Sequence, residues 1–407
     1  MKQEVMSLRT GQFTKNECVE KPKKRGDCLN MNDKSRSYKL IITVSMTLIA
    51  LLLILTLMLQ LQNNNLGHVE YTLYLSNNTL MKGDAIPKFH TLNAPYCIVY
   101  DPNGYVYVTD FLSNSVFVIN ASTNKVVTNI SVGLYPTGIA YDPNGYVYVV
   151  NSGSNSISVI NPSTNGVIAN ISVPGGSNIV YDSHNDHLYV TDPGGNSISI
   201  INPSSNTVTK IVRVSGPYGI TYDPINDLIY VTNYYSGTVS VINPNTSQVV
   251  TNISVGLYPT GIAYDPNGYV YVVNSGSNSI SVINPSTNRV VTNIRVGESP
   301  YAIAYDYHTG YLYVTNFGSN FISIINPTMN KIIGNVRVEY YPHGITYDPI
   351  NDRIYVTNYY SGTISIVSTS SSVNVFTIFI LLWIIIIATI VGLLLRLLLI
   401  GKWRRRA

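Results

Sequence analysis

Two places in the sequence hold residue types that bind metals or move protons. Residues 181–187 contain two histidines and two aspartates within seven positions, and both types are common metal ligands. Other copies of this segment read Asp-Pro-Asn-Gly or Asp-Pro-Ile-Asn-Asp, so we interpret 181–187 as a polar turn. His343 is the other place, and it could act as a general acid or base. No metal site and no cofactor is predicted.

These residues are positioned by a sequence repeat. Residues 126–165 recur without change at 249–288, and looser copies fill most of the chain. A Tyr-Asp pair marks each copy, at Tyr100, Tyr141, Tyr181, Tyr222, Tyr264, Tyr305 and Tyr347. Seven copies of one unit predict a repeat architecture.

Each copy is expected to form four short strands. In the second copy these are Thr137–Tyr141, Tyr146–Val150, Ser156–Ile160 and Val167–Val173, and Asp142-Pro143-Asn144-Gly145 makes the first turn. The second strand is apolar on both faces, which indicates a sheet covered on both sides. The sequence therefore predicts an all-β fold, a seven-bladed β-propeller of four-stranded antiparallel blades, flanked by an N-terminal and a C-terminal transmembrane helix.

The seventh copy lacks a fourth strand. Residues 84–92, before the first copy, align with residues 125–133, so we expect them to close blade seven and to remove two open sheet edges. The propeller is predicted to span 84–368. The third strand of the seventh copy ends at the bottom of the ring and the closing strand begins there, so the bottom is expected to face the membrane.

Two apolar segments, 40–61 and 375–400, are long enough to cross a bilayer. A cleaved signal peptide is the alternative for the first, but the segment is long and no small-residue cleavage site follows. Residues 1–39 and 401–407 are basic tails, and 62–83 and 369–374 are linkers. The positive-inside rule predicts a two-pass cell-membrane protein with both termini cytoplasmic and the propeller outside.

Several repeat cores carry the Tyr-Val-Thr-Asn sequence or a close variant. Tyr230-Val231-Thr232-Asn233 and Tyr313-Val314-Thr315-Asn316 are two of them, and an Ile-Asn-Pro element or a similar one follows in six copies. Over residues 84–368 the chain resembles the YVTN β-propeller repeat family and is similar to surface-layer-like propellers. The resemblance implies the fold but no single function.

The loops between blades, and between the second and third strands, form the top of the ring. They are rich in aromatic residues, and the residue after each repeat proline is expected to surround the central opening. The opening positions are Tyr96, Thr137, Ser177, Tyr218, Thr260, Tyr301 and His343. The candidate binding residues are Tyr96, Tyr135, Tyr218, Tyr234, Tyr235, Tyr258, Tyr301, Tyr341, His343, Tyr359 and Tyr360. Exposed aromatic rings beside hydroxyl and amide groups are typical of binding surfaces, although the same rings could only pack the loops together.

Charge and modification signals limit the partners. Residues 63–372 carry 10 Lys/Arg and 16 Asp/Glu, a net charge of −6 (10 − 16), which argues against nucleic-acid binding. Glycosylation sequons occur at Asn77, Asn120, Asn129, Asn170, Asn245 and Asn252. Cys18 and Cys28 lie in the N-terminal tail and are expected to be free thiols.

The near-identical blades suit a multivalent surface better than one active site, which needs different residues on different blades. We therefore expect a membrane-anchored cell-surface module that binds an extracellular protein or polysaccharide, and not an enzyme. A structural envelope component is the alternative. A lyase or hydrolase with its site near His343, at the mouth of the channel, is the third hypothesis.

Overall fold

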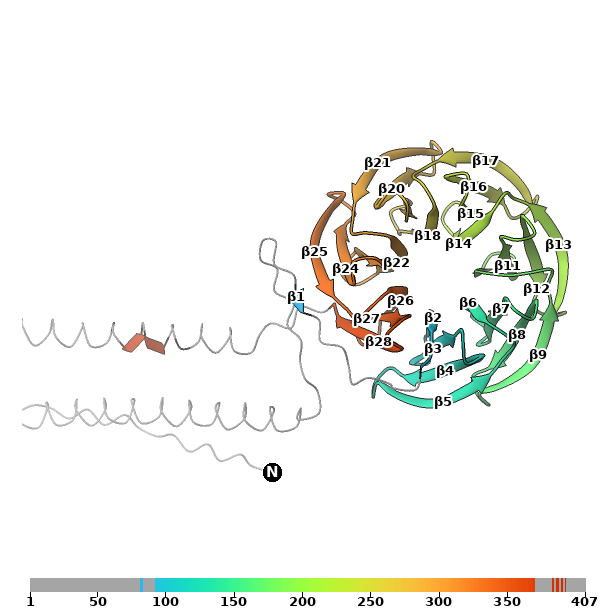
Figure 1. Cartoon of the computed structure of the whole chain (residues 1–407). Coiled ribbons are helices and arrows are strands. Elements are labelled where there is room, and N and C mark those ends of the chain that lie inside the picture. Colours follow the sequence, from blue (N-terminus) through green and yellow to red (C-terminus); the bar gives the residue numbers. More distant parts are fainter. Residues whose placement is uncertain are drawn as a thin grey trace, which may run out of the picture. The chain divides into compact units, whose positions relative to one another are not determined.

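The computed structural model describes residues 81–82 and 92–369, together with six helical residues between Trp383 and Gly392. The chain divides into two compact units, Met1–Glu70 and Tyr71–Ala407, and every described residue belongs to the second. Seven sheets surround a central axis, and their innermost strands include β2, β6, β14, β18, β22 and β26 (Figure 1). The predicted all-β, seven-bladed propeller is confirmed.

The strands of blades one to seven follow in chain order. Blades one and two contain β2 (Pro95–Asp101), β3 (Tyr105–Asp110), β4 (Ser115–Asn120), β5 (Lys125–Ser131), β6 (Pro136–Tyr141), β7 (Val147–Asn151), β8 (Ser156–Asn161) and β9 (Gly166–Ser172). Blades three and four contain β10 (Ile179–Asp182), β11 (His187–Asp192), β12 (Ser197–Asn202), β13 (Thr207–Arg213), β14 (Pro217–Asp223), β15 (Leu228–Asn233), β16 (Thr238–Asn243) and β17 (Gln248–Ser254). Blades five to seven contain β18 (Pro259–Tyr264), β19 (Val270–Asn274), β20 (Ser279–Asn284), β21 (Arg289–Arg295), β22 (Pro300–Asp306), β23 (Tyr311–Asn316), β24 (Phe321–Asn326), β25 (Lys331–Arg337), β26 (Pro342–Asp348), β27 (Arg353–Asn358) and β28 (Thr363–Ser368).

Consecutive strands within each blade from β2 to β28 are antiparallel, as predicted. In blade two, β7 pairs with β6 and β8, with Tyr148 opposite Ala140 and Val159. The predicted strands of this blade agree with the observed ones to within one residue at each end. Every residue of β7 is buried, because each sheet packs against a sheet on both faces.

The hydrophobic core lies between adjacent blades. The tyrosine at the centre of each second strand is at most 2% exposed and is among the largest fully buried side chains; these residues are Tyr107, Tyr148, Tyr189, Tyr230, Tyr271, Tyr313 and Tyr355. Tyr148 packs with Leu188 and Val190 of the next blade. The tyrosine of the repeat core therefore holds each blade to its neighbour by burial of apolar surface.

The seven buried tyrosines differ in their hydroxyl groups. The Tyr271 hydroxyl donates to the Asp265 carboxylate at 3.1 Å, whereas the equally buried Tyr230 hydroxyl has no hydrogen-bond partner. We expect Tyr271→Phe to lower the free energy of unfolding by about 1.5–3 kcal/mol, because a bond to a charged group is lost. Tyr230→Phe is expected to be neutral or stabilising. Urea unfolding of both variants checks this, and equal losses would contradict it.

The threonine of the repeat core joins neighbouring blades through hydrogen bonds. Thr232 Oγ1 accepts from the Gly219 amide at 2.7 Å and donates to the Thr260 carbonyl of the next blade at 2.9 Å. Blades two and five have valine at this position. In blade five the bond to the next blade is made by Thr260 of the inner strand, whose Oγ1 donates to the Tyr301 carbonyl at 2.8 Å. The threonines that donate to the next blade as Thr232 does are Thr109, Thr191, Thr315 and Thr357.

Replacing Thr232 by valine keeps the shape of the side chain and removes its hydroxyl. The Gly219 amide and the Thr260 carbonyl then lose a partner in a buried place, so we expect the free energy of unfolding to fall by about 1–3 kcal/mol. Thr246→Val, at an exposed position, is the control and should change it by less than about 0.5 kcal/mol. Equal effects in denaturant unfolding would show that the hydroxyl does not join the blades.

Blades six and seven differ from the other five. Blade seven has three described strands, in the order β26-β27-β28, and blade six gains a fifth strand, β1 (Met81–Lys82), which runs parallel to β25. The sequence placed residues 62–83 in a linker, so β1 was not predicted. Lys82 lies opposite Arg337, at the top-side end of β25, which differs from the expectation that this linker leaves from the bottom. Thr369, after β28, does lie at the bottom, where its amide donates to the Asp352 carbonyl at 2.8 Å.

Most of the predicted closing strand lies outside the described residues, so closure of blade seven by 84–92 stays a prediction. Its last residue, Leu92, is buried in a core shared with Ile364 and Ile366 of blade seven. A Cβ on Gly362 would meet the Leu92 carbonyl. In blade four, a Cβ on Gly237 would likewise meet the carbonyl of Gly256, the residue that aligns with Leu92. Leu92 therefore lies beside blade seven as its alignment with the repeats predicts.

Blades seven and one are joined by polar contacts between residues far apart in sequence. Arg353 Nη1 donates to the Ala121 carbonyl at 2.9 Å, and the Tyr355 hydroxyl donates to Asn124 Oδ1 at 3.0 Å. Side chains of the last blade therefore help to close the ring against the first.

The two predicted membrane spans and both basic tails lie outside the described residues, apart from the six residues near Trp383. Among the residues that are described, no helix is long and apolar enough to cross a membrane. The predicted two-pass membrane topology therefore rests on the sequence alone.

Candidate functional site

Three tyrosines cross the central opening at the top of the ring. Tyr96, Tyr218 and Tyr301 stand at the second positions of the inner strands β2, β14 and β22. The Tyr96 hydroxyl lies 3.2 Å from that of Tyr218 and 3.1 Å from that of Tyr301, and the last two are also hydrogen-bonded to each other. Because these blades are not adjacent in the ring, the three side chains fill the opening where short Thr and Ser side chains stand in blades two, three and five.

His343 of blade seven lies between two of these rings. Its ring centroid is 4.0 Å from that of Tyr96 and 3.8 Å from that of Tyr301, and Nδ1 donates to the Tyr96 carbonyl at 3.0 Å. The side chain is 6% exposed, and this burial lowers the pKa of His343 to about 3. The imidazole is therefore neutral near pH 7 and a weak base.

The candidate residues form one continuous aromatic network. Each of the three tyrosines in the opening contacts an aromatic residue in a loop of its own blade, which then contacts a tyrosine of the next blade. The contacts in the outer halves of these series are close, with ring centroids 4.8 to 5.1 Å apart. We call the three series the aromatic arms: Tyr96–Phe111–Tyr135, Tyr218–Tyr234–Tyr258 and Tyr301–Phe317–Tyr341.

The tyrosines at the outer ends of the arms, Tyr135, Tyr258 and Tyr341, are called the platform tyrosines below. They have φ angles of 52°, 51° and 57°, and they are 46%, 48% and 39% exposed. A bulky residue at positive φ is unusual and costs about 1 kcal/mol or more. Gly216 holds the equivalent position before β14, with a φ of 57°. The backbone at this position therefore favours glycine, yet three blades place an exposed tyrosine there.

Neighbouring residues fix the platform tyrosines. The Tyr135 and Tyr341 amides donate to the side chains of Asn114 and Asn320 at 2.9 and 3.0 Å. The Tyr135 ring also lies on Gly153, where an added Cβ would approach the ring to 2.4 Å. The ring is thus held between Phe111 and a glycine, and its remaining surface faces solvent.

The remaining candidate residues extend the network. Tyr235 and Tyr360 are 78% and 77% exposed, and they contact Tyr234 and Tyr341 edge-on. Tyr359 contacts Tyr96 and His343. All eleven sequence-predicted residues therefore belong to one network.

A pocket of about 410 Å³ opens beside His343. Its lining residues come from blades one, five, six and seven and are Tyr96, Ser275, Ser299, Tyr301, Phe317, His343 and Tyr359. Ser275 and Ser299 were not among the candidate residues. Ser275 stands where four other blades have an aromatic loop residue, and Ser299 stands where three have a platform tyrosine. These small residues therefore leave the space open.

The top-side loops carry only negative formal charge. Between residues 92 and 362 these loops contain Glu298 and Glu339 and neither Lys nor Arg. The lysines and arginines of residues 92–369 stand on outer strands, except Arg353 at the start of β27. The surface around the opening is therefore aromatic and polar, with a slight negative charge.

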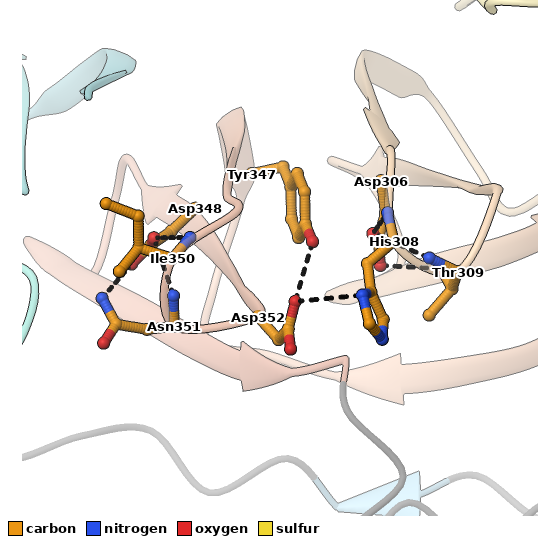
Figure 2. Close-up of polar contacts among 8 residues, drawn as sticks. All are labelled: Asp306, His308, Thr309, Tyr347, Asp348, Ile350, Asn351 and Asp352. Carbon is orange, nitrogen blue, oxygen red and sulfur yellow. Dashed lines mark hydrogen bonds and ion pairs between the residues drawn. The ribbon is translucent and has the colours of Figure 1, made fainter.

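The hairpin turns at the bottom use their carboxylates to hold the chain (Figure 2). Asp348 Oδ1 accepts from the Ile350 and Asn351 amides at 2.9 and 3.1 Å, and Asp352 accepts from the Tyr347 hydroxyl at 3.0 Å. His308 of the neighbouring hairpin lies 3.9 Å from Asp352. These aspartates therefore act as turn formers, as the repeats predict.

The segment 181–187 is built in the same way. Asp182 Oδ1 accepts from the His184 amide at 2.9 Å, and His187 Nδ1 donates to the Asn185 carbonyl at 2.6 Å. Within the described part of the chain, no three His, Cys, Asp or Glu side chains are grouped as metal ligands would be.

The described sequons lie away from the top loops. Asn129, Asn170 and Asn252 are exposed on the outer strands β5, β9 and β17, and Asn120 and Asn245 stand at bottom hairpins. A glycan on any of these five sequons would leave the top face accessible. The sixth sequon, Asn77, and the two N-terminal cysteines, Cys18 and Cys28, lie outside the described part of the chain.

The fold and the opening define the class of the molecule as a seven-bladed β-propeller with an aromatic top face. Comparison with models of protein families and with sequences of characterised proteins gave no match. Among solved structures, the chain is similar to Kuenenia stuttgartiensis hydrazine synthase, with 19% identity over 69% of this chain and 97% of that chain and a TM-score of 0.63.

Virginiamycin B lyase from Staphylococcus aureus is similar as well, with 20% identity over 70% of this chain and 99% of that chain and a TM-score of 0.61. A catalytically inactive histidine-to-alanine variant of that lyase, solved with quinupristin, matches at 20% identity over 70% of this chain and 98% of that chain, also with a TM-score of 0.61. At this level of identity, the likeness shows the fold alone.

Proposed function

We propose that this chain is a membrane-anchored, YVTN-type propeller that binds an extracellular partner through its top face. The observation that carries the proposal is the conformation of the platform tyrosines. Three blades keep an exposed tyrosine where the backbone favours glycine. Strained residues that persist in a fold are concentrated at functional sites, and tyrosine combines a large apolar ring with a polar hydroxyl.

The duplication of the platform favours a polysaccharide partner. Tyr135 and Tyr258 lie within the two identical segments of the sequence and stack on Phe111 and Tyr234. The same serine- and glycine-rich loop packs against both tyrosines. Gly153 lies against the Tyr135 ring, and Gly276 lies against the Tyr258 ring. Two like surfaces suit a ligand with repeated, chemically like units, and simultaneous binding at both raises the overall affinity.

The charges around the top face support the same partner. The top-side loops of residues 92–362 contain Glu298 and Glu339 and no Lys or Arg, so they offer no cation to an anionic chain such as nucleic acid or an acidic polysaccharide. A neutral polysaccharide offers apolar ring faces for the tyrosines and hydroxyl groups for serine and asparagine side chains. A protein partner is the other outcome of the test.

The proposal is tested by retention of the purified full chain, in detergent, on insoluble neutral polysaccharides and on cell-envelope material. A variant with Tyr234, Tyr235, Tyr359 and Tyr360 replaced by Ala is the comparison. We expect wild type to be retained and the variant to be depleted by at least about tenfold, since each stacked ring contributes on the order of 0.5–1.5 kcal/mol. Retention only on protease-sensitive envelope material would favour a protein partner, and equal retention of both chains would exclude these four tyrosines from the binding surface.

The two-pass membrane topology is proposed from the sequence. Protease added to intact cells is expected to cut within residues 84–368 and to spare residues 1–39, because the tail is placed on the cytoplasmic side. Epitope tags at the N-terminus and in the 122–124 hairpin turn report the two regions separately. Loss of the N-terminal tag together with protection of the hairpin tag would reverse the topology.

A further inference from the structure

The pocket beside His343 has the composition of an aromatic cage. Five of its seven lining residues are aromatic, and the other two, Ser275 and Ser299, are small. Phe317 lies 6.3 Å from Tyr301 and 6.2 Å from His343, measured between ring centroids, so the rings surround one volume. A volume of about 410 Å³ is sufficient for a small ligand.

The electrostatics of the pocket favour a positive group. Ring faces carry a negative quadrupole potential, and no Lys or Arg is among the lining residues. Burial keeps the His343 imidazole neutral at physiological pH by lowering its pKa, so it does not repel a cation. Glu298 precedes Ser299, is exposed, and its side chain lies next to Gly318, directly after Phe317. Glu298 therefore adds a formal negative charge next to the segment that carries Phe317.

We propose that this pocket binds a quaternary or fully methylated ammonium group, held by cation–π contact with Phe317, Tyr359 and Tyr301. Such a group is weakly hydrated and has no N–H to satisfy, so a cage of rings is sufficient for it. A primary ammonium or a metal ion would lose strong hydration and would need oxygen ligands. Carboxylates are missing from the lining residues.

This site is separate from the platform tyrosines, and it stands whether or not the top face binds a polysaccharide. None of Tyr135, Tyr258 and Tyr341 lines the pocket. The double variant Tyr135→Gly/Tyr258→Gly should therefore bind a quaternary ammonium ligand like wild type, even where it fails to bind the polysaccharide.

The test compares choline with its neutral isostere 3,3-dimethylbutan-1-ol, which has the same shape and no charge. Calorimetric titration of the full chain in detergent is expected to give at least about tenfold tighter binding for choline, because only the charged ligand gains cation–π attraction to the rings. Equal affinity for the two ligands, or no detectable choline binding, would overturn the proposal.

Variants locate the site. Phe317→Leu and Tyr359→Leu should each weaken choline binding by about 5- to 20-fold, and Glu298→Gln by about twofold. Tyr307→Leu, an exposed aromatic on a bottom hairpin, is the control and should bind like wild type. If Phe317→Leu does not fold, Tyr359→Leu and the isostere comparison in wild type still decide the outcome. Choline binding that survives both leucine variants would place the site elsewhere and overturn the proposal.

Discussion

Glycine at both Tyr135 and Tyr258 is expected to lower retention on the polysaccharide by about 5- to 150-fold while the propeller stays folded. Loss of two stacking surfaces, each worth about 0.5–1.5 kcal/mol with tyrosine, accounts for this fall when both sites bind one chain. The backbone keeps its shape because glycine adopts a positive φ without strain. Relief of that strain offsets most of the lost contact between each tyrosine and its arm, so we expect each single replacement to change the free energy of unfolding by less than about 1 kcal/mol.

Two controls separate the loss of the ring from an effect on the backbone. Tyr135→Phe keeps the ring and should keep most of the binding. Tyr135→Ala keeps the unfavourable φ and loses the ring, so it should be less stable than Tyr135→Gly, the reverse of the usual order. Thermal unfolding checks this order. An alanine variant more stable than the glycine variant would show that the positive φ is not maintained.

The second large effect is a loss of stability in mild acid that depends on His343. Burial depresses the pKa of His343 to about 3 in the folded chain, against about 6.5 when unfolded. The unfolded state therefore binds more protons between these values, and stability falls as the pH falls. The full contribution is present above about pH 6.5 and is lost progressively toward pH 3. Each pH unit amounts to about 1.4 kcal/mol, so the loss from pH 6.5 to 5 is about 2 kcal/mol.

The measurement is the difference between wild type and His343→Gln, because other groups titrate in the same range. Glutamine is neutral at every pH and keeps an N–H group for the Tyr96 carbonyl. The difference in free energy of unfolding should shift by about 2 kcal/mol, in favour of the variant, between pH 6.5 and 5. A difference that does not change with pH would mean that the imidazole is protonated as readily in the folded chain as in the unfolded one.

The strands and the blades could be predicted because the same local signals occur seven times. The turn Asp142-Pro143-Asn144-Gly145 and the apolar second strand fix two strand ends in one copy, and the other copies repeat them. The predicted bounds were therefore within one residue in blade two. The eleven candidate residues were also correctly placed on one side of the ring, since strand direction alone decides which loops share a face.

The arrangement within that face could not be predicted. The meeting of Tyr96, Tyr218 and Tyr301 depends on the radius of the ring, which no local pattern encodes. The positive φ of the platform tyrosines was missed because tyrosine gives no signal for it, although Gly216 at the equivalent position did. The strand β1 was missed because two residues are too few to show an alternating pattern.

The most direct test of the binding surface is a calorimetric titration with oligosaccharides of increasing length, released from the polysaccharide that retains the full chain. The paired platforms predict an affinity that rises by up to about tenfold once an oligosaccharide spans both sites, and that returns to the short-chain value in Tyr135→Gly and in Tyr258→Gly alike. An affinity that is independent of length, or unchanged in both glycine variants, would contradict binding at the platform tyrosines.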